Sequence, residues 1–427
     1  MFNSKPIIFI YVDALRRDLL VANVLKIKLE KKFSVYLVSR SNYKRILKLV
    51  TPDIYIIIKN FLKNMENDIA DTLKKAHTIV IDSEGAMNEE RANFHLEHMA
   101  INLDKILPYI KKSFVWNENF KKFINKHVSH ELNKIEVVGS SKVSLSFLCN
   151  KLKFPKRNKK IGFVGRFGCI NSFNLTTALQ TSITRIFDVD EYRHGAIGEL
   201  KVLEIYINLI KKILSETNYN ISIRPHPNEY YDSWNILKKM DKRIEISEKY
   251  SDFLEWMNEQ DVIITTPSTS MVEPLLNQIP IISIHKISDT SGLHAYYEDM
   301  LRPFRDNAII PNNFEEIIEL LNKNEIKNPD FSAETILALK NYYNIDSENG
   351  KNAISKIIQY INTVETLKTN ILKKIYTSMV YFTINFYEYF KITLKKNKIS
   401  SNYNFNYFIH NQEDKFAKKL SDLDDRL

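Results

Sequence analysis

The sequence predicts an α/β protein with two domains, each built around its own parallel sheet. Its 427 residues are too many for one ordinary domain and suit two of about 150–200 residues. Short runs rich in isoleucine and valine alternate with amphipathic, lysine-rich segments, which is typical of a parallel sheet covered by helices on both faces. The alternation restarts after a basic stretch at 151–160, which we interpret as a linker. We expect the two domains to face a cleft.

The expected domains span residues 1–155 and 156–365. In the first domain the apolar runs predict strands at 7–12, 34–38, 54–58, 78–81 and 136–138. In the second they predict strands at 161–164, 220–224, 244–247, 262–266 and 281–284. Helical patterns lie between the strands, and residues 313–362 read as largely helical and close the second domain.

The last segment, 366–427, differs in kind and reads as a helical C-terminal extension. Seven aromatic residues stand within residues 375–390, and the flanking lysines are Lys373, Lys374, Lys391, Lys395, Lys396 and Lys398. Aromatic rings between cations suit the headgroup boundary of a membrane. Packing of these rings on the core or on a partner subunit is the alternative, and the sequence leaves it open.

Composition narrows the range of functions. The chain has 61 Lys+Arg against 51 Asp+Glu, a net charge of +10, which indicates a polyanionic partner. The basic residues are dispersed instead of forming one stripe, so we expect no nucleic-acid binding. Two cysteines cannot form a disulfide framework or a Cys-based zinc site, and they suit a reducing cytosol. No export signal and no apolar run of about 18 residues is evident.

Residues 221–229, Ile-Ser-Ile-Arg-Pro-His-Pro-Asn-Glu, run from a predicted strand into a rigid polar exit. Two prolines bracket His226 and fix the backbone as it leaves the sheet. Ligands of doubly wound sheets sit beyond the carboxyl ends of the strands, so we expect Arg224 and His226 at that edge, where they suit a nucleotide phosphate. A turn histidine that satisfies only local backbone groups remains the alternative.

A second strand ends in hydroxyl residues around Pro267, and a helix is expected to begin near Ser270. Backbone N–H groups at a helix start, together with the hydroxyls of Ser268, Thr269 and Ser270, suit an anion. Glu273, one turn further on, is placed to accept hydrogen bonds from ribose hydroxyls. An ordinary helix cap is the alternative.

In the first domain, Asp82, Ser83, Glu84 and Gly85 follow a predicted strand. A carboxylate at the edge of a cleft can act as a general base toward a hydroxyl acceptor. A capping or turn acid is the alternative reading.

Two further segments bear on cofactors and metals. Residues 162–168, Gly-Phe-Val-Gly-Arg-Phe-Gly, depart from the G-x-G-x-x-G fingerprint, so a nicotinamide site is poorly supported, but Arg166 or the amides of the turn suit a phosphate. The match Asp188-Val-Asp190 to a metal signature is short and lacks a clear preceding strand. We expect no metal site and no cofactor.

The ordered set of motifs resembles bacterial sialyltransferases and capsule polymerases of the two-domain GT-B type. Those enzymes have an acidic D/E-D/E-G motif, a His-Pro motif and a Ser-Ser/Thr motif, which match residues 82–85, His226-Pro227 and residues 268–270 here. Ser83 departs from the acidic pattern. The wider segments are similar to surface-carbohydrate transferases that use CMP-activated nonulosonic acids or Kdo, and to glycerophosphotransferases that use CDP-glycerol.

This resemblance implies the roles of the site residues. Glu84 would be the general base, and His226 would stabilise the departing CMP phosphate with the help of Ser268, Thr269 and Ser270. We therefore expect a metal-independent glycosyltransferase that transfers a CMP-activated keto-acid sugar to a glycan or lipid-linked glycan for a capsule or lipopolysaccharide. It is expected to lie in the cytoplasm, at the inner face of the bacterial inner membrane.

Three other functions remain open at this stage. A CDP-glycerol-type polyol-phosphate transferase would release CMP but transfer the phosphate to its acceptor. A non-catalytic scaffold of polysaccharide assembly would bind no nucleotide. A nucleotide-sugar epimerase would turn over a UDP-sugar with no acceptor present.

Overall fold

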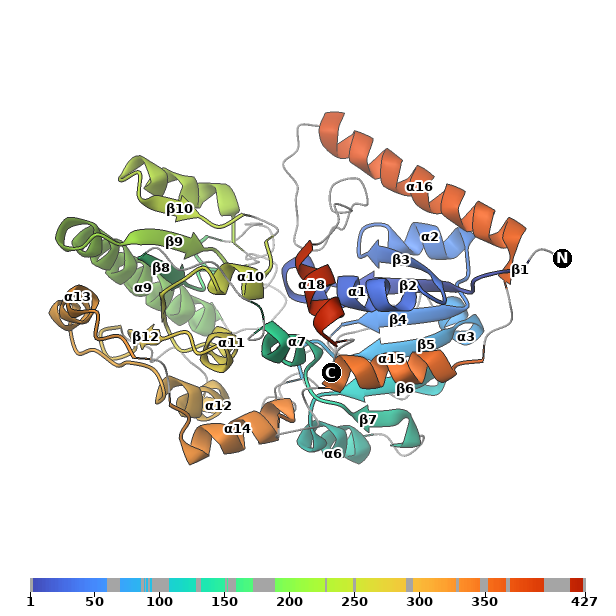
Figure 1. The fold of residues 1–427 in the computed structure, drawn as a ribbon, viewed down its shortest axis with the longest axis horizontal. Coiled ribbons are helices and arrows are strands. Elements are labelled where there is room, and N and C mark those ends of the chain that lie inside the picture. The colour runs from blue at the N-terminus through green and yellow to red at the C-terminus, as the bar shows by residue number, and fades with distance from the viewer. Residues whose placement is uncertain are drawn as a thin grey trace. The chain divides into compact units, whose positions relative to one another are not determined.

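The computed structural model describes residues 3–59, 70–85, 88, 90, 93, 107–127, 132–149, 152, 159–171, 189–226, 229–248, 251–288, 295–327, 330–345, 352–365, 369–394 and 415–424. The chain divides into two compact units (Figure 1). The first unit contains Met1–Leu148 and Leu339–Leu427, and the second contains Cys149–Ala338. Asp188 lies outside the described residues.

The first unit is built on a parallel sheet of six strands in the order β3-β2-β4-β5-β6-β7. Its strands are β2 (Ile7–Val12), β3 (Ser34–Ser39), β4 (Ile54–Ile58), β5 (His77–Ile81), β6 (Ile110–Val115) and β7 (Ile135–Val137). Its helices are α1 (Leu15–Leu29), α2 (Tyr43–Leu49), α3 (Ala70–Lys75), α6 (Glu118–His127), α7 (Ser141–Cys149), α15 (Ala353–Thr363), α16 (Ile371–Leu394) and α18 (Lys415–Asp424). Two 3₁₀ turns are η2 (Leu107–Tyr109) and η3 (Leu132–Lys134).

Burial explains why most of these strands were predictable and one was not. All five residues of β4 are buried, as expected of a strand covered on both faces. The predicted strand runs correspond to β2, β3, β4, β5 and β7. The strand β6 was missed because Lys111 and Lys112 interrupt its apolar run, and Lys112 forms an ion pair with Glu136 on the neighbouring strand.

The C-terminal part of the chain returns to the first unit. Tyr360 on α15 contacts His77 and the ring of Phe114, so α15 packs beside the first sheet although the sequence placed residues 313–362 with the second domain. The short strand β1 (Asn3–Ser4) pairs antiparallel with β13 (Thr369–Asn370), and this pairing anchors the start of α16. An amphipathic pattern identifies a helix but does not say which sheet the helix covers.

The second unit contains a parallel sheet of five strands in the order β10-β9-β8-β11-β12. Its strands are β8 (Lys160–Val164), β9 (Asn220–Arg224), β10 (Ile244–Ile246), β11 (Val262–Thr265) and β12 (Ile281–Ser283). Its helices are α9 (Val189–Glu216), α10 (Phe253–Met257), α11 (Val272–Leu276), α12 (Ala295–Arg305) and α13 (Phe314–Lys323), with 3₁₀ segments η4 (Tyr231–Lys239) and η5 (Thr269–Met271). The helix α14 (Ala333–Tyr343) crosses the division between the units.

The two parallel sheets, their helices and the C-terminal helices confirm the predicted α/β class. Each sheet has its own buried cluster of apolar side chains, centred on Phe9 and Tyr55 in the first unit and on Phe163 and Tyr206 in the second. In each sheet, considered by itself, the carboxyl ends of the parallel strands lie along one edge, where ligands of such folds bind.

Candidate functional site

Three loops of the second unit leave the same edge of its sheet. The strands β9, β8 and β11 are neighbours, and Arg224, Val164 and Thr265 are register partners at their ends. Arg166 and His226 each stand two residues beyond such an end, and Ser268 stands three residues beyond. The fold thus brings the glycine turn, the His-Pro segment and the hydroxyl segment together at one edge.

A buried carboxylate joins two of these loops. Oε1 of Glu229 accepts hydrogen bonds from the backbone N–H groups of Phe167 and His226, each at 3.0 Å, and Oε2 accepts one from Nε1 of Trp234 at 2.7 Å. Burial raises the pKa of Glu229 to about 7 although these donors oppose the shift. Glu229 therefore fixes the backbone of His226 against the turn after β8.

Glu229 was not predicted from the sequence as a site residue. The pattern His-x-x-Glu is a local signal, because the N–H of Glu229 also donates to the carbonyl of His226 at 2.9 Å and closes a tight turn. The bond to Phe167, however, spans 62 positions of sequence, and only the fold makes it visible.

Three backbone amides in and just after the glycine turn are occupied by carboxylates of the protein itself. Oε2 of Glu199 accepts hydrogen bonds from the N–H groups of Cys169 at 2.7 Å and Ile170 at 3.1 Å, and Glu229 binds Phe167. Of these three residues only Phe167 lies within the predicted turn at 162–168, so its amide is not available to a phosphate, and the expectation for the other amides of the turn stays a prediction. Arg166, whose side chain is exposed, is the cation that this turn presents.

The hydroxyl segment caps a short helical stretch. Oγ of Ser268 accepts a hydrogen bond from the N–H of Ser270 at 3.3 Å, and the two hydroxyls also bind one another. The 3₁₀ turn η5 begins at Thr269, which is exposed, and continues into α11. Glu273, in the first turn of α11, is only 5 % exposed.

Arg224 has a different setting from the one the sequence suggested. Only 6 % of the residue is exposed, and its guanidinium donates to Oγ of Ser251 at 2.9 Å and to the carbonyl of Ser251 at 2.7 Å. It also lies over the rings of Phe253 and Trp256, at 5.6 and 5.7 Å from their centroids. These contacts favour a role in holding the loop that precedes α10.

In the first unit, the acidic turn after β5 is tightly built. The N–H of Asp82 donates to the carbonyl of Phe114, and Nε1 of Trp116 donates to the carbonyl of Asp82 at 2.8 Å. A Cβ added to Gly85 would lie 2.0 Å from Oδ2 of Asp82 and 3.0 Å from Cγ of Trp116. Gly85 is required here by close approach, whereas the sequence suggested only a sharp turn.

Glu84, the expected base, forms an ion pair with Arg17, and its side chain is 25 % exposed. The same guanidinium binds Asp18 at 2.7 Å and Asp13 at 3.2 Å, so one cation is shared by three carboxylates. Burial raises the pKa of Asp18 although Arg17 opposes the shift. Arg17, Asp13 and Asp18 were not predicted as site residues, because the ion pair to Glu84 joins the start of α1 to the turn after β5, two segments far apart in the chain.

The structure thus groups the predicted residues on two edges. Arg166, His226, Ser268, Thr269, Ser270 and Glu273 belong to the second unit, and Glu84 belongs to the first. Among the described residues, no group of three or more His, Cys, Asp or Glu side chains has the geometry to hold a metal ion.

The chain is similar to known proteins in its fold. No family model matches the chain, and no curated protein matches it in sequence. A variant of the wall teichoic acid polymerase TagF soaked with CDPG has a TM-score of 0.50 at 12 % identity, over 84 % of this chain and 87 % of that chain. The S. aureus MnaA–UDP structure has a TM-score of 0.50 at 11 % identity, over 86 % and 100 %. The UDP-GlcNAc 2-epimerase from Methanocaldococcus jannaschii has a TM-score of 0.44 at 13 % identity, over 84 % and 100 %.

The first two similarities show the fold, which is the two-domain α/β architecture of the GT-B type predicted from the motifs. At these identities they show the fold alone.

The packing at Gly85 predicts a large difference between two glycine substitutions. Gly85→Ala should lower the free energy of unfolding by about 2 kcal/mol or more, because its Cβ collides with a buried carboxylate. Gly168→Ala is the matched control, since a Cβ there meets nothing within 4 Å, and it should change stability by less than about 0.5 kcal/mol. Urea unfolding measures both, and equal stability of the two variants would contradict the assigned packing.

The raised pKa of Glu229 predicts a pH dependence of stability. Its folded-state pKa of about 7 exceeds the ordinary 4.5, so its contribution is full below pH 4.5 and is lost as the pH rises through 7. Between about pH 5 and pH 8 the wild type should lose about 2–3 kcal/mol from this group. Urea unfolding of Glu229→Gln should lack this loss, whereas Glu204→Gln, an exposed carboxylate on α9, should keep it. A wild-type slope in Glu229→Gln would contradict the shift.

Proposed function

We propose that the protein is a glycosyltransferase whose donor nucleotide binds at the carboxyl edge of the second sheet. The observation that supports this most is the convergence of Arg166, His226 and residues 268–270 on neighbouring strand ends. A cationic side chain, an imidazole and several hydroxyls suit the phosphate of a nucleotide. In the similar folds, MnaA was solved with UDP and TagF with CDPG, which is compatible with a nucleotide at such a fold.

The donor we propose is a CMP-activated keto-acid sugar, of the nonulosonic acid or Kdo type. In the transfer, the acceptor oxygen forms a bond to the anomeric carbon while the bond from that carbon to the CMP phosphate breaks. The electron pair of the broken bond goes to the phosphate oxygen, where His226 donates a hydrogen bond and Arg166 compensates charge. Donors placed where charge develops supply much of the rate enhancement in such reactions.

Glu84 is the proposed base that takes the proton of the acceptor hydroxyl. It shares the guanidinium of Arg17 with Asp13 and Asp18, and its side chain is partly exposed. Asp13 and Asp18 hold Arg17 in place, so they act as positioning residues.

Two residues of the site receive supporting roles in this proposal. Arg224 holds the loop before α10 through Ser251, and Glu229 fixes the backbone of His226. Glu273 is the proposed partner of the ribose hydroxyls, at the start of α11. Ser268, Thr269 and Ser270 are the proposed hydroxyl donors to the phosphate; Thr269 is exposed, and the bonds between Ser268 and Ser270 hold the turn in place.

The proposed acceptor is a glycan or a lipid-linked glycan of a surface polysaccharide, at the cytoplasmic face of the inner membrane. In the part of the chain that the structure describes, no helix is long and apolar enough to cross a membrane. The attachment that we propose is peripheral.

The second candidate is a CDP-glycerol-type polyol-phosphate transferase, favoured by the likeness of the fold to TagF. Both reactions release CMP, but only this one leaves a phosphate on the acceptor. Phosphate analysis of the product decides between them. Failure to bind any nucleotide, as expected of a non-catalytic scaffold, would contradict both functions.

A thermal-shift screen tests the donor site. A ligand that binds only the native state raises the unfolding temperature by mass action, so CMP should raise it more than CDP, UDP, UMP or GDP. A larger shift with UDP or GDP points to a nucleotide-diphosphate sugar, and no shift with any nucleotide contradicts the donor site.

His226→Ala should reduce turnover by about 10²-fold or more, because it removes a donor to the departing phosphate. The unfolding temperature without ligand should stay close to that of the wild type, since the side chain lies at the sheet edge. His226→Gln, which keeps a hydrogen-bond donor, should recover part of the rate. Full activity of a folded His226→Ala protein would refute the phosphate role.

Glu84→Gln should reduce turnover by about 10²–10⁴-fold and leave the CMP-induced thermal shift unchanged, because a general base acts on the acceptor and not on the nucleotide. Glu118→Gln, an exposed carboxylate at the start of α6, is the matched control and should keep wild-type turnover. Wild-type turnover in Glu84→Gln would remove it from the mechanism.

A further inference from the structure

The helix α16 exposes a broad apolar face, while its buried side carries both apolar residues, Val380 and Tyr381, and polar residues, Thr377 and Asn385. Of the 18 large apolar side chains that are exposed in the described part of the chain, ten lie on this helix. They are Ile371, Leu372, Ile375, Tyr376, Met379, Phe382, Phe386, Tyr387, Tyr389 and Phe390, and we call them the outer face of α16. At 100° per residue they occupy one continuous arc of about 160°.

The opposite side of α16 is fixed to the first unit by polar contacts. Lys373 binds Asp53 at 2.8 Å, and Nδ2 of Asn42 donates to Oδ1 of Asn385 at 3.1 Å. The hydroxyl of Tyr381 donates to the carbonyl of Leu37 at 2.8 Å. These contacts reach β3 and the start of α2, beside which α16 lies in Figure 1. The orientation of the helix is therefore determined, and the outer face is the one turned from the sheet.

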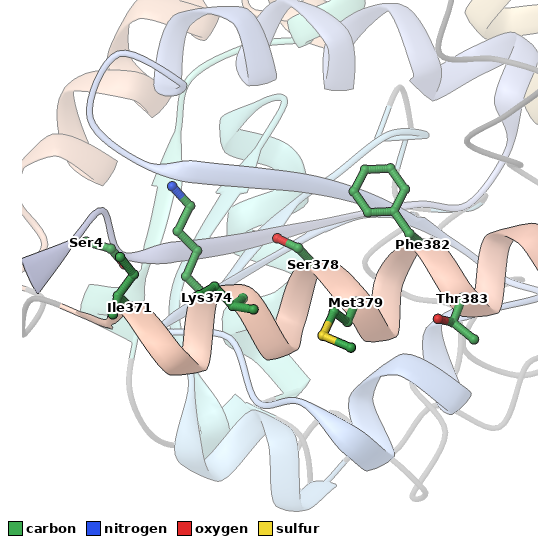
Figure 2. Close-up of a pocket in the computed structure, with 8 residues that line it drawn as sticks. Ser4, Ile371, Lys374, Ser378, Met379, Phe382 and Thr383 are labelled. Carbon is green, nitrogen blue, oxygen red and sulfur yellow. The ribbon is translucent and has the colours of Figure 1, made fainter. Parts of the chain in front are cut away.

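The outer face borders a surface hollow of about 580 Å³. Figure 2 shows Lys374, Ser378 and Phe382 projecting from one side of the helix at intervals of four residues, with Met379 turned elsewhere. Lys374 thus stands beside apolar side chains, where a lysine stem can lie along them while its ammonium group stays at the rim.

The charges around the outer face favour an anionic partner. The acidic residue of the helix, Glu388, is paired with Arg45, and Lys373 is paired with Asp53. Lys374 near the start and Lys391 near the end remain as cations that border the face. A second copy of this helix would present the same lysines and repel them, whereas anionic lipid headgroups offer the opposite charge.

We propose that the outer face of α16 binds the surface of an anionic bilayer, with the helix lying in the plane of the interface. Phenylalanine and leucine side chains enter the acyl boundary, tyrosine rings take the headgroup level, and lysines contact anionic headgroups. The inference rests on the proposed membrane position of the enzyme and names the surface that provides it.

Vesicle sedimentation of the full chain tests this proposal. Vesicles of phosphatidylcholine and phosphatidylglycerol in equal parts should bind the protein, and vesicles of phosphatidylcholine alone should bind it more weakly. The double variant Met379→Glu/Phe386→Glu should bind the mixed vesicles at least about tenfold more weakly. Lys374→Ala/Lys391→Ala should lose about tenfold or more on mixed vesicles only.

The controls separate this surface from the proposed function. Ile336→Glu alters an equally exposed apolar residue on α14 and should bind vesicles as the wild type does. The CMP-induced thermal shift should persist in the α16 variants, since their side chains are exposed and belong to no donor loop. Loss of that shift in the wild type would contradict the proposed function and leave the vesicle result standing.

Wild-type vesicle binding by Met379→Glu/Phe386→Glu would overturn the proposal. So would a wild-type dimer, detected by light scattering, that the same substitutions dissociate while no vesicle binding is seen. That second result would assign the outer face to another copy of the chain.

Discussion

The candidate donor edge depends on one buried carboxylate. Glu229 accepts the backbone N–H groups of Phe167 and His226 with a single oxygen, so the exits of two neighbouring strands are held by the same atom. Its other oxygen is held by Trp234 on η4, which fixes the rotamer. Because burial brings the pKa of this carboxyl to about 7, the strength of the whole arrangement varies within the physiological range of pH. The geometry of His226 is thereby coupled to a residue that need not touch a ligand.

The two sheet edges use carboxylates in opposite ways. At the edge of the second sheet, Glu199 and Glu229 accept hydrogen bonds from backbone N–H groups. The loop after β8 presents Arg166 as an exposed cation. At the edge of the first sheet, three carboxylates, among them Glu84, share the guanidinium of Arg17. An edge with an exposed cation suits a phosphate, and an edge with a partly exposed carboxylate suits the proton of a hydroxyl. This contrast supports assigning donor and acceptor chemistry to different units.

Sequence alone predicted what depends on local pattern. Isoleucine and valine runs revealed β2, β4 and β9 because strands buried on both faces have no alternation to obscure them. The strand β6 was not predicted, because Lys112 forms its ion pair with Glu136 on a neighbouring strand. Such a tertiary contact cannot be seen in the local sequence. The positions of His226 and Ser268 at one edge followed from strand order, but Arg224 did not behave as expected, because the partners of its guanidinium, Ser251 and Trp256, lie beyond the next strand. Glu229 and Arg17 were missed for the same reason, since their defining bonds join segments far apart in the chain.

In the helix α16, the periodic pattern of apolar residues does not reveal which side of the helix faces the core. A stripe of apolar residues normally marks the side of a helix that faces the core, because that is where burial is favourable. Here the buried side is held by polar bonds to Asp53, Asn42 and a strand carbonyl together with apolar packing of Val380 and Tyr381 in the core, and a second, larger apolar face is left exposed. Removing the apolar stripe from water is then left to something outside the described fold. Since polar bonds to the core also fix the rotation of the helix, the stripe is held outward as a rigid surface, and binding through it needs no rearrangement of the first unit.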